Sequence, residues 1–143
     1  MSITSANAII TLSQPVLFPS GPVQLEGFAV DDVWDFEKVK TVEELMGVDG
    51  VLSFGFVWVA RRQNIMLQAD SASNDFFDTL NMQQEAARDV YTLSGSAILA
   101  GIATKFTMIN GALTEYTPVP AVKRTLMPRS HRITWNRVIP SPQ

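Results

Sequence analysis

The sequence predicts a mainly β fold, a β-sandwich or partial barrel of two sheets, with one flanking α-helix. Most of the chain consists of short segments rich in β-branched and aromatic residues, separated by glycine, proline, asparagine and aspartate, a pattern typical of strands and turns. Only residues 73–88 repeat apolar side chains at helical spacing. The 143 residues include no cysteine, and a chain of this length buries a core without disulfides. We therefore expect residues 1–143 to form a single domain.

The first third of the chain predicts two extended segments. Residues 6–12 alternate weakly and are rich in β-branched side chains, so they predict a first strand. A proline-containing loop follows, and residues 23–36 then form a long extended piece. The alternation within this piece changes phase, which predicts a bulge or turn near Asp31 and Asp32.

Residues 41–50 form a polar interruption between predicted strands. Thr41 is a suitable cap for a single helical turn that ends at Gly47. Asp49 and Gly50 then predict a tight turn into the next strand.

Residues 51–60 give the clearest strand signal in the chain. Both faces of this strand are largely apolar, so we expect both to be covered. Residues 61–64 predict a turn, after which residues 65–69 return as the second strand of a hairpin.

The predicted helix begins at Ser73 and ends near Arg88. The Ser73 hydroxyl is a suitable N-cap, and Asp75 favours the first turn. One face carries apolar side chains at helical spacing: Phe76, Phe77, Leu80 and Ala87.

The remaining residues predict strands again. The predicted segments are 90–93, 97–108, 112–117, 123–127 and 131–139. Residues 94–96 separate the first two, and Asn110 with Gly111 is a strong hairpin signal. In the last segment Ile133, Trp135 and Arg137 share a face, Trp135 is expected in the core, and the prolines that follow end the fold.

The charge of the chain is sparse and unevenly distributed. Hydrophobic residues make up 46% and charged residues 17%, well below the usual fraction of about 25%, which suggests that part of the surface is covered by partners. Residues 1–50 carry a net charge of −6 and residues 101–143 a net charge of +5. Either acidic and basic parts of different copies meet head to tail, or the two parts neutralise each other within one chain.

No set of residues predicts catalysis or metal binding. His131 is the only histidine, has no cysteine to complete a zinc site, and is expected on the surface. Two acidic groups are candidates for acid–base chemistry, the cluster of Asp31, Asp32 and Asp35 and the pair Glu43 and Glu44, but clustered acids in polar segments usually face water. We therefore expect no enzyme activity, no catalytic residue, no metal and no cofactor.

Nothing in the sequence predicts membrane association. The longest apolar stretches are far shorter than the about 20 residues that cross a bilayer. The first twelve residues carry no lysine or arginine, so they do not resemble a targeting signal.

Several segments resemble bacteriophage tail tube proteins of the contractile-tail, myovirus type. The likeness runs from the motif Gly47-Val48-Asp49-Gly50-Val51 and the 51–69 segment to Asp70-Ser71-Ala72-Ser73-Asn74-Asp75-Phe76-Phe77. It continues with Met82-Gln83-Gln84 in the predicted helix and Thr134-Trp135 in the last strand. The overall similarity covers about residues 5–139, and its motifs are loose rather than invariant.

The resemblance implies a structural virion protein. Subunits of this family form hexameric rings whose strands join into an inner barrel, and the rings stack into a tube through which phage DNA passes without specific binding. The implied partners are further copies of the chain, the tail sheath, the baseplate and the tail terminator. The implied location is the phage tail, assembled in the cytoplasm of the bacterial host. Residues 36–50 match the extended loop that bridges rings.

Charged residues of the two oppositely charged parts are the candidates for contacts between rings or subunits. They are Glu37, Lys38, Lys40, Glu43, Glu44, Asp49, Arg124, Arg129, Arg132 and Arg137.

Three other functions remain open. A tail terminator or baseplate protein would share this composition and fold. A small ligand-binding β-barrel would instead have an apolar pocket, lined by Trp34, Trp58 or Trp135. An enzyme built on the aspartate cluster is the third alternative.

Overall fold

A computed structural model describes residues 8–29 and 33–142 of the chain. The elements follow in the order β1 (Ala8–Ser13), β2 (Val23–Gln24), β3 (Trp34–Phe36), β4 (Val42–Met46), β5 (Leu52–Phe56), β6 (Arg61–Leu67), α1 (Asn74–Ala87), β7 (Leu93–Leu99), the short 3-10 helix η2 (Ala100–Ile102), β8 (Thr104–Tyr116) and β9 (Arg129–Pro142). The bulge predicted near Asp31 and Asp32 lies outside the described residues.

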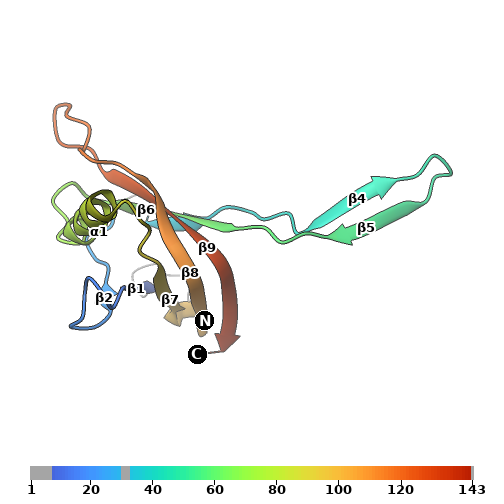
Figure 1. The fold of residues 1–143 in the computed structure, drawn as a ribbon, viewed down its shortest axis with the longest axis horizontal. Helices are drawn as coiled ribbons and strands as arrows, with labels where there is room; N and C mark the ends of the chain where they lie inside the picture. Colours follow the sequence, from blue (N-terminus) through green and yellow to red (C-terminus); the bar gives the residue numbers. More distant parts are fainter. Residues whose placement is uncertain (1–7, 30–32, 143) are drawn as a thin grey trace.

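Seven antiparallel strands form one curled sheet, in the order β2-β1-β7-β8-β9-β6-β3. The helix α1 lies on one side of this sheet (Figure 1). The other two strands, β4 and β5, pair only with each other and project far from the rest of the molecule (Figure 1). The predicted class, mainly β with two sheets and one flanking helix, is confirmed.

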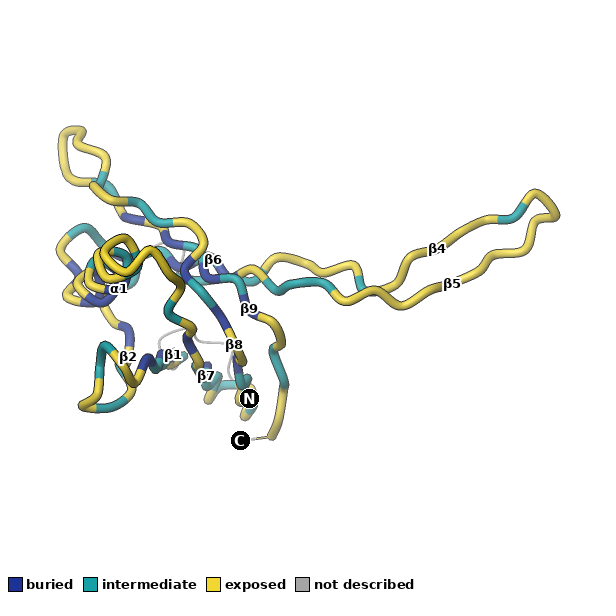
Figure 2. The backbone as a smooth tube through the Cα atoms, viewed as in Figure 1, coloured by how far each residue is buried: buried dark blue, intermediate teal, exposed yellow. Residues whose placement is uncertain are grey.

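The core lies between α1 and the curled sheet, where Figure 2 shows the buried residues. Phe77 and Leu80 come from the helix, and both are fully buried. Ile133 and Trp135 of β9 are also fully buried, which confirms the core position predicted for Trp135, whereas Arg137, predicted on the same face, is exposed. Trp135 donates from Nε1 to Oε1 of the equally buried Gln63 at 3.0 Å, which satisfies the indole N–H.

The helix lies where the sequence predicts it, but its first residue acts differently. Ser73 occupies the N-cap position without a capping hydrogen bond from its side chain. Its Oγ instead accepts a hydrogen bond from the Glu26 amide at 2.8 Å, which ties the helix to the segment after β2. Arg88 ends the helix in a left-handed conformation with φ 53°, and Ala87, predicted on the apolar face, is exposed.

The helical turn predicted for residues 41–47 is wrong. Val42–Met46 is strand β4, and it pairs with β5 from Val42–Phe56 to Met46–Leu52. Tertiary pairing therefore overrides a weak local capping signal. The tight turn predicted at Asp49 and Gly50 is present, with Gly50 at φ 84°.

The hairpin predicted between residues 51–60 and 65–69 is also wrong. Residues 61–64 do not turn the chain, because Arg61–Leu67 is the continuous strand β6, which pairs with β9 and β3. The strand β5 is exposed along its whole length within this chain, so the expected cover on both faces is absent there. Its apolar character must be explained by something outside the subunit's own core.

Two turns predicted in the C-terminal half are strand interiors. Residues 94–96 lie within β7, where a Cβ on Gly95 would come within 2.8 Å of the Thr11 carbonyl oxygen of β1. Asn110 has φ 51°, yet β8 runs on through it. A Cβ on Gly111 would come within 2.3 Å of the Trp135 ring, so this glycine makes room for the indole instead of a hairpin turn.

Three other extended segments differ in length from the prediction. In the described parts of the 23–36 segment, residues 23–29 and 33–36, the only strands are the short β2 and β3. Residues 123–127 contribute one bridge, between Val122 and Leu126. The last strand runs through the terminal prolines to Pro142 rather than ending before them.

Candidate assembly surfaces

Residues 37–60 form a protruding arm. The arm leaves the sheet after the Glu37 amide donates to the Arg62 carbonyl at 3.0 Å. Its outer part is the β4–β5 ribbon, closed by the Gly47–Gly50 turn, and it extends well away from the curled sheet (Figure 1). A two-stranded ribbon on its own is only marginally stable in water, so we expect packing against another surface to stabilise the arm.

One face of the ribbon is apolar and uncovered. Residues directly opposite each other in an antiparallel pair share a face. The register therefore places on one face Val42, Glu44, Met46, Leu52, Phe54 and Phe56. The other face carries Glu43, Leu45, Ser53 and Gly55. Of the twenty large hydrophobic residues that are exposed in the described part of the chain, eleven lie between Val39 and Trp58, and such a concentration marks an interaction site.

The outer arm is also acidic. Residues 41–58 contain Glu43, Glu44 and Asp49 and no lysine or arginine. At the arm's base, Lys40 lies 3.3 Å from Glu44 and 3.6 Å from Glu43, and all three side chains are exposed. The hydrogen bond to Glu44 and the charge of Glu43 raise the pKa of Lys40.

The β8–β9 loop, residues 117–128, is a second exposed surface, at the end of the molecule away from the arm (Figure 1). Val119, Val122 and Leu126 expose 56–75% of their surface there. The loop also carries Lys123 and Arg124, both exposed, and no acidic residue.

A buried arginine holds the base of this loop. Arg129 donates from Nη2 to the Thr117 carbonyl at 2.9 Å and to Oδ1 of Asp78 at 2.7 Å. It also donates to the Pro118 carbonyl at 3.3 Å, and Tyr116 donates its hydroxyl to the same carboxylate. Burial would raise the pKa of Asp78, but the hydrogen bonds from Arg129 and Tyr116 outweigh it and lower that pKa.

His131 lies beside this network and is buried, which corrects the expectation of a surface residue. Its ring stacks between Phe77, at 4.5 Å, and Tyr116, at 5.3 Å. Its Nε2 lies 3.3 Å from Oδ1 of Asn74. Burial, followed by the positive charge of Arg129, lowers the pKa of His131 to about 4, so the ring is neutral at neutral pH.

The predicted contact residues lie in three different places. Lys38, Lys40, Glu43, Glu44 and Asp49 are exposed on the arm, and Arg124 is exposed on the β8–β9 loop. Arg137 is exposed on β9. Arg129 is buried with its donors satisfied inside the chain, so it is removed from the contact candidates.

Glu37 and Arg132 meet within the chain. Nη2 of Arg132 lies 2.8 Å from Glu37, and its Nε lies 3.1 Å from Glu115. Part of the acidic–basic asymmetry is therefore neutralised inside one subunit. Among the described residues, Arg124 and Arg137 form no ion pair, and neither do Asp49 and Lys38.

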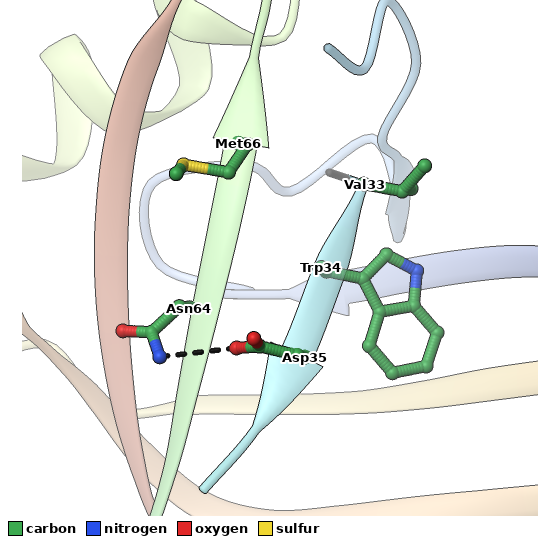
Figure 3. Close-up of a pocket in the computed structure, with 5 residues that line it drawn as sticks. All are labelled: Val33, Trp34, Asp35, Asn64 and Met66. Carbon is green, nitrogen blue, oxygen red and sulfur yellow. Dashed lines mark hydrogen bonds between the residues drawn. The ribbon is translucent and has the colours of Figure 1, made fainter. Parts of the chain in front are cut away.

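A small pocket of about 230 Å³ lies at the β3 edge of the sheet. Figure 3 shows its lining residues, with Asn64 donating from Nδ2 to Oδ1 of Asp35 at 3.0 Å. Trp34 is the only one of the three tryptophans that lines it, since Trp135 is fully buried and Trp58 stands 72% exposed on the arm. The volume is below the roughly 300–1,000 Å³ of typical ligand sites. This pocket gives the ligand-binding alternative little support.

The described residues offer little else for chemistry. Within residues 8–29 and 33–142, no helix is long and apolar enough to span a membrane. In the same ranges, no three histidine, aspartate or glutamate side chains are placed to hold a metal ion. Of the acidic cluster, Asp31 and Asp32 lie outside the described residues, and Asp35 is exposed beside the pocket.

Sequence reasoning missed the apolar residues that these surfaces expose. Phe54 and Phe56 were expected in the core because a strand with two apolar faces is usually covered. The signal that indicates an exposed strand is the acidic segment just before it, which contains residues 43, 44 and 49. Val119, Val122 and Leu126 lie among prolines and bases, and no periodicity identifies them.

Solved structures of other proteins share this fold. No curated protein matches the chain. The tube-terminating cap of the anti-feeding prophage matches all of this chain and 93% of that one, with 14% identity and a TM-score of 0.62. A sheath–tube complex of the extracellular contractile injection system PVC matches with 13% identity and a TM-score of 0.64, covering 99% of this chain and 93% of that one. The sheath/tube terminator of PVC gives 12% identity and a TM-score of 0.64, covering 99% and 97%.

At these identities the likeness establishes a shared fold. The sequence itself identifies the family, because residues 1–139 match the one described as tail fiber protein gp32. Since the match covers nearly the whole chain, the protein belongs to the tail fiber protein gp32 family.

Proposed function

We propose that this chain is a non-enzymatic structural subunit of a contractile tail, and that it acts at the end of the tail tube as a terminator. The gp32 family and the structures of similar fold are described as parts of tails or tail-like particles, which supports the general role. Two of the three solved structures are end-of-tube components, which favours a terminator over a subunit of the tube body.

The observation that carries an assembly function is the exposed apolar face of the arm. A monomer would leave Phe54 and Phe56 in water, each about two-thirds exposed, on a ribbon that no other part of the sheet supports. Burying such a face against a neighbouring subunit stabilises both the ribbon and the assembly. In this proposal, residues 36–50 belong to the segment that reaches across to the next subunit or ring.

Open strand edges offer a second contact. β6 pairs with β9 only as far as Trp135, so among the described strands the rest of β9 has β8 as its single neighbour. On the opposite side of the sheet, β2 pairs only Thr11 and Leu12 of β1. In a ring, the β1 edge of one subunit would lie beside the β9 edge of the next, which would remove both edges from solvent.

A subunit of the tube body is the second candidate. It is supported by the tail tube resemblance in the sequence and by the fold shared with a sheath–tube complex. Its partners would be copies of the chain in hexameric rings, the sheath, the baseplate and DNA in the lumen. Both candidates place the protein in the virion after assembly in the host cytoplasm.

Negative-stain electron microscopy of the purified protein, combined with light scattering over a range of concentrations, distinguishes the candidates. A terminator is expected to form discrete rings that do not lengthen as concentration rises. Hollow tubes that lengthen with concentration would favour the tube body instead. A monomer at every concentration would reject self-assembly of this chain and contradict both candidates.

A further inference from the structure

Hydrogen bonds and prolines restrain the backbone of the β8–β9 loop. The Met127 amide donates to the Ala121 carbonyl at 2.9 Å, and Arg129 holds the loop's first two residues through their carbonyls. Three prolines, at positions 118, 120 and 128, further restrict the backbone. The loop is therefore preorganised, and preorganisation lowers the entropic cost of binding.

This ordered loop presents its apolar side chains to solvent. Val119, Val122 and Leu126 are each more than half exposed and are not part of the core. Lys123 and Arg124 lie between the last two of them and form no ion pair with any described residue. The surface combines an apolar patch with a charge of +2.

The outer arm has the complementary character. Residues 41–58 combine an apolar ribbon face with three acidic side chains and no basic one, and together with Lys40, which pairs with Glu43 and Glu44, the outer arm carries a charge of −2. The arm and the loop project from different ends of the same molecule, so the arm does not lie against its own loop (Figure 1). A contact between them requires two copies of the chain, and it joins unlike surfaces, as a ring or a stack does.

We propose that the β8–β9 loop is the docking site for the arm of a second copy of this chain. This inference rests on the assembly function proposed above and names the receiving surface. The apolar ribbon face packs on Val119, Val122 and Leu126. Glu44 lies on this face, and Glu43 is next to it in the sequence on the opposite face, so the acidic charge of the arm comes near Lys123 and Arg124. Charge complementarity of this kind selects the partner and orients it.

Charge reversal on each side tests the contact. The loop variant is Lys123→Glu/Arg124→Glu and the arm variant is Glu43→Lys/Glu44→Lys. All four side chains are exposed, so both variants are expected to keep the wild-type denaturation midpoint. Each variant alone should associate about tenfold more weakly or worse, because like charges then face each other. An equimolar mixture should regain association, because the arm of each variant then meets a loop of opposite charge.

A matched control changes two exposed basic residues away from every proposed contact. Arg62 on β6 and Arg88 at the end of α1 lie outside the arm, the β8–β9 loop and the β9 edge, so Arg62→Glu/Arg88→Glu makes the same charge change elsewhere. It should associate as the wild type does. Sedimentation velocity of the wild type, the three variants and the mixture measures these outcomes.

Two kinds of result overturn the inference. The first leaves the proposed assembly function standing, and the second contradicts it as well. If the wild type associates and the loop variant associates equally well, or the mixture stays dissociated, the receiving surface is not this loop although assembly stands. If the wild type does not associate at any concentration, the proposed function fails together with the inference.

Discussion

Trp135 and Phe54 are both large aromatic residues on strands, yet they meet opposite environments. Trp135 is fully buried in the core and packs against Gly111, whereas Phe54 is 68% exposed on the arm. The curled sheet and helix, residues 8–29, 33–36 and 61–142, form the body, and its apolar side chains cover one another. The arm has only its own two strands. Apolar side chains of the body therefore stabilise the subunit, whereas those of the arm are available for association.

The largest expected effect is on the body. Trp135→Ala removes a fully buried indole and leaves Gln63 without its hydrogen bond, so we expect the free energy of unfolding to fall by about 3–5 kcal/mol. The matched change on the arm, Trp58→Ala, should alter it by less than about 0.5 kcal/mol because that side chain is largely exposed. Urea denaturation under conditions that keep the protein monomeric measures both. Similar losses in the two variants would contradict the distinction between body and arm.

The next effect is a pH dependence confined to the body. The folded-state pKa of His131, about 4, lies below the ordinary value of 6.5. Between these values the unfolded chain binds a proton that the folded chain does not, so stability is fully present above pH 6.5 and falls as the pH drops toward 4. A shift of this size corresponds to a loss of about 3 kcal/mol.

His131→Phe provides the control for this pH dependence. Phenylalanine keeps the stack between Phe77 and Tyr116 and cannot be protonated. The difference in stability between the variant and the wild type should therefore change with pH only between about 6.5 and 4, across the interval set by the two pKa values. A difference that stays constant across this range would show that His131 is protonated equally in the folded and unfolded states.

Local patterns predicted the body better than its connections. The single helix follows from the spacing of Phe76, Phe77 and Leu80, and the buried face of β9 from the alternation around Trp135. The pairing of the strands could not be predicted from local patterns. An Asn-Gly sequence such as Asn110-Gly111 is typical of a hairpin turn, but the same two residues also fit inside a strand where the glycine makes room for an indole ring. Which of the two forms depends on Trp135, twenty-four residues further along the chain.

Of the candidate surfaces, only the charged residues could be predicted from the sequence. The acidic residues of the arm and Arg124 of the loop were identified from composition, while the burial of Arg129 and His131 was not. Their burial depends on Asp78, Asn74 and Tyr116, which come from distant parts of the chain. The sequence of one chain shows that a strand is apolar, but it does not show whether the surface that covers this strand belongs to the same chain or to a neighbouring subunit.

A smaller effect is expected where the body meets the β8–β9 loop. Arg129→Met removes the donors that hold the Thr117 and Pro118 carbonyls and leaves Asp78 without its ion pair. We expect a loss of about 2 kcal/mol, because Asp78 keeps partial access to water. Arg124→Met, on the exposed part of the loop, should change stability by less than about 0.5 kcal/mol. Denaturation measures both, and limited proteolysis within residues 117–128 should be faster only in the Arg129 variant.

The smallest expected effect on stability accompanies the largest on assembly. Phe54→Ser/Phe56→Ser removes two aromatic side chains from the apolar face of the arm, and both are already exposed in the monomer. The free energy of unfolding of the body should change by less than about 0.5 kcal/mol. The loss of two aromatic anchors, at about 1.5–3 kcal/mol for each fully buried side chain, should abolish rings at concentrations where the wild type forms them.

Leu45→Ser is the matched control, because Leu45 is equally exposed but lies on the other face of the same ribbon. Rings that persist in this variant and disappear in the double variant would assign association to one face of the arm. Equal loss in both would mean that the ribbon is covered on both sides in the assembly, as a strand with two apolar faces usually is. In that case the expectation drawn from the sequence for residues 51–60 would hold for the assembly although it fails for the isolated subunit.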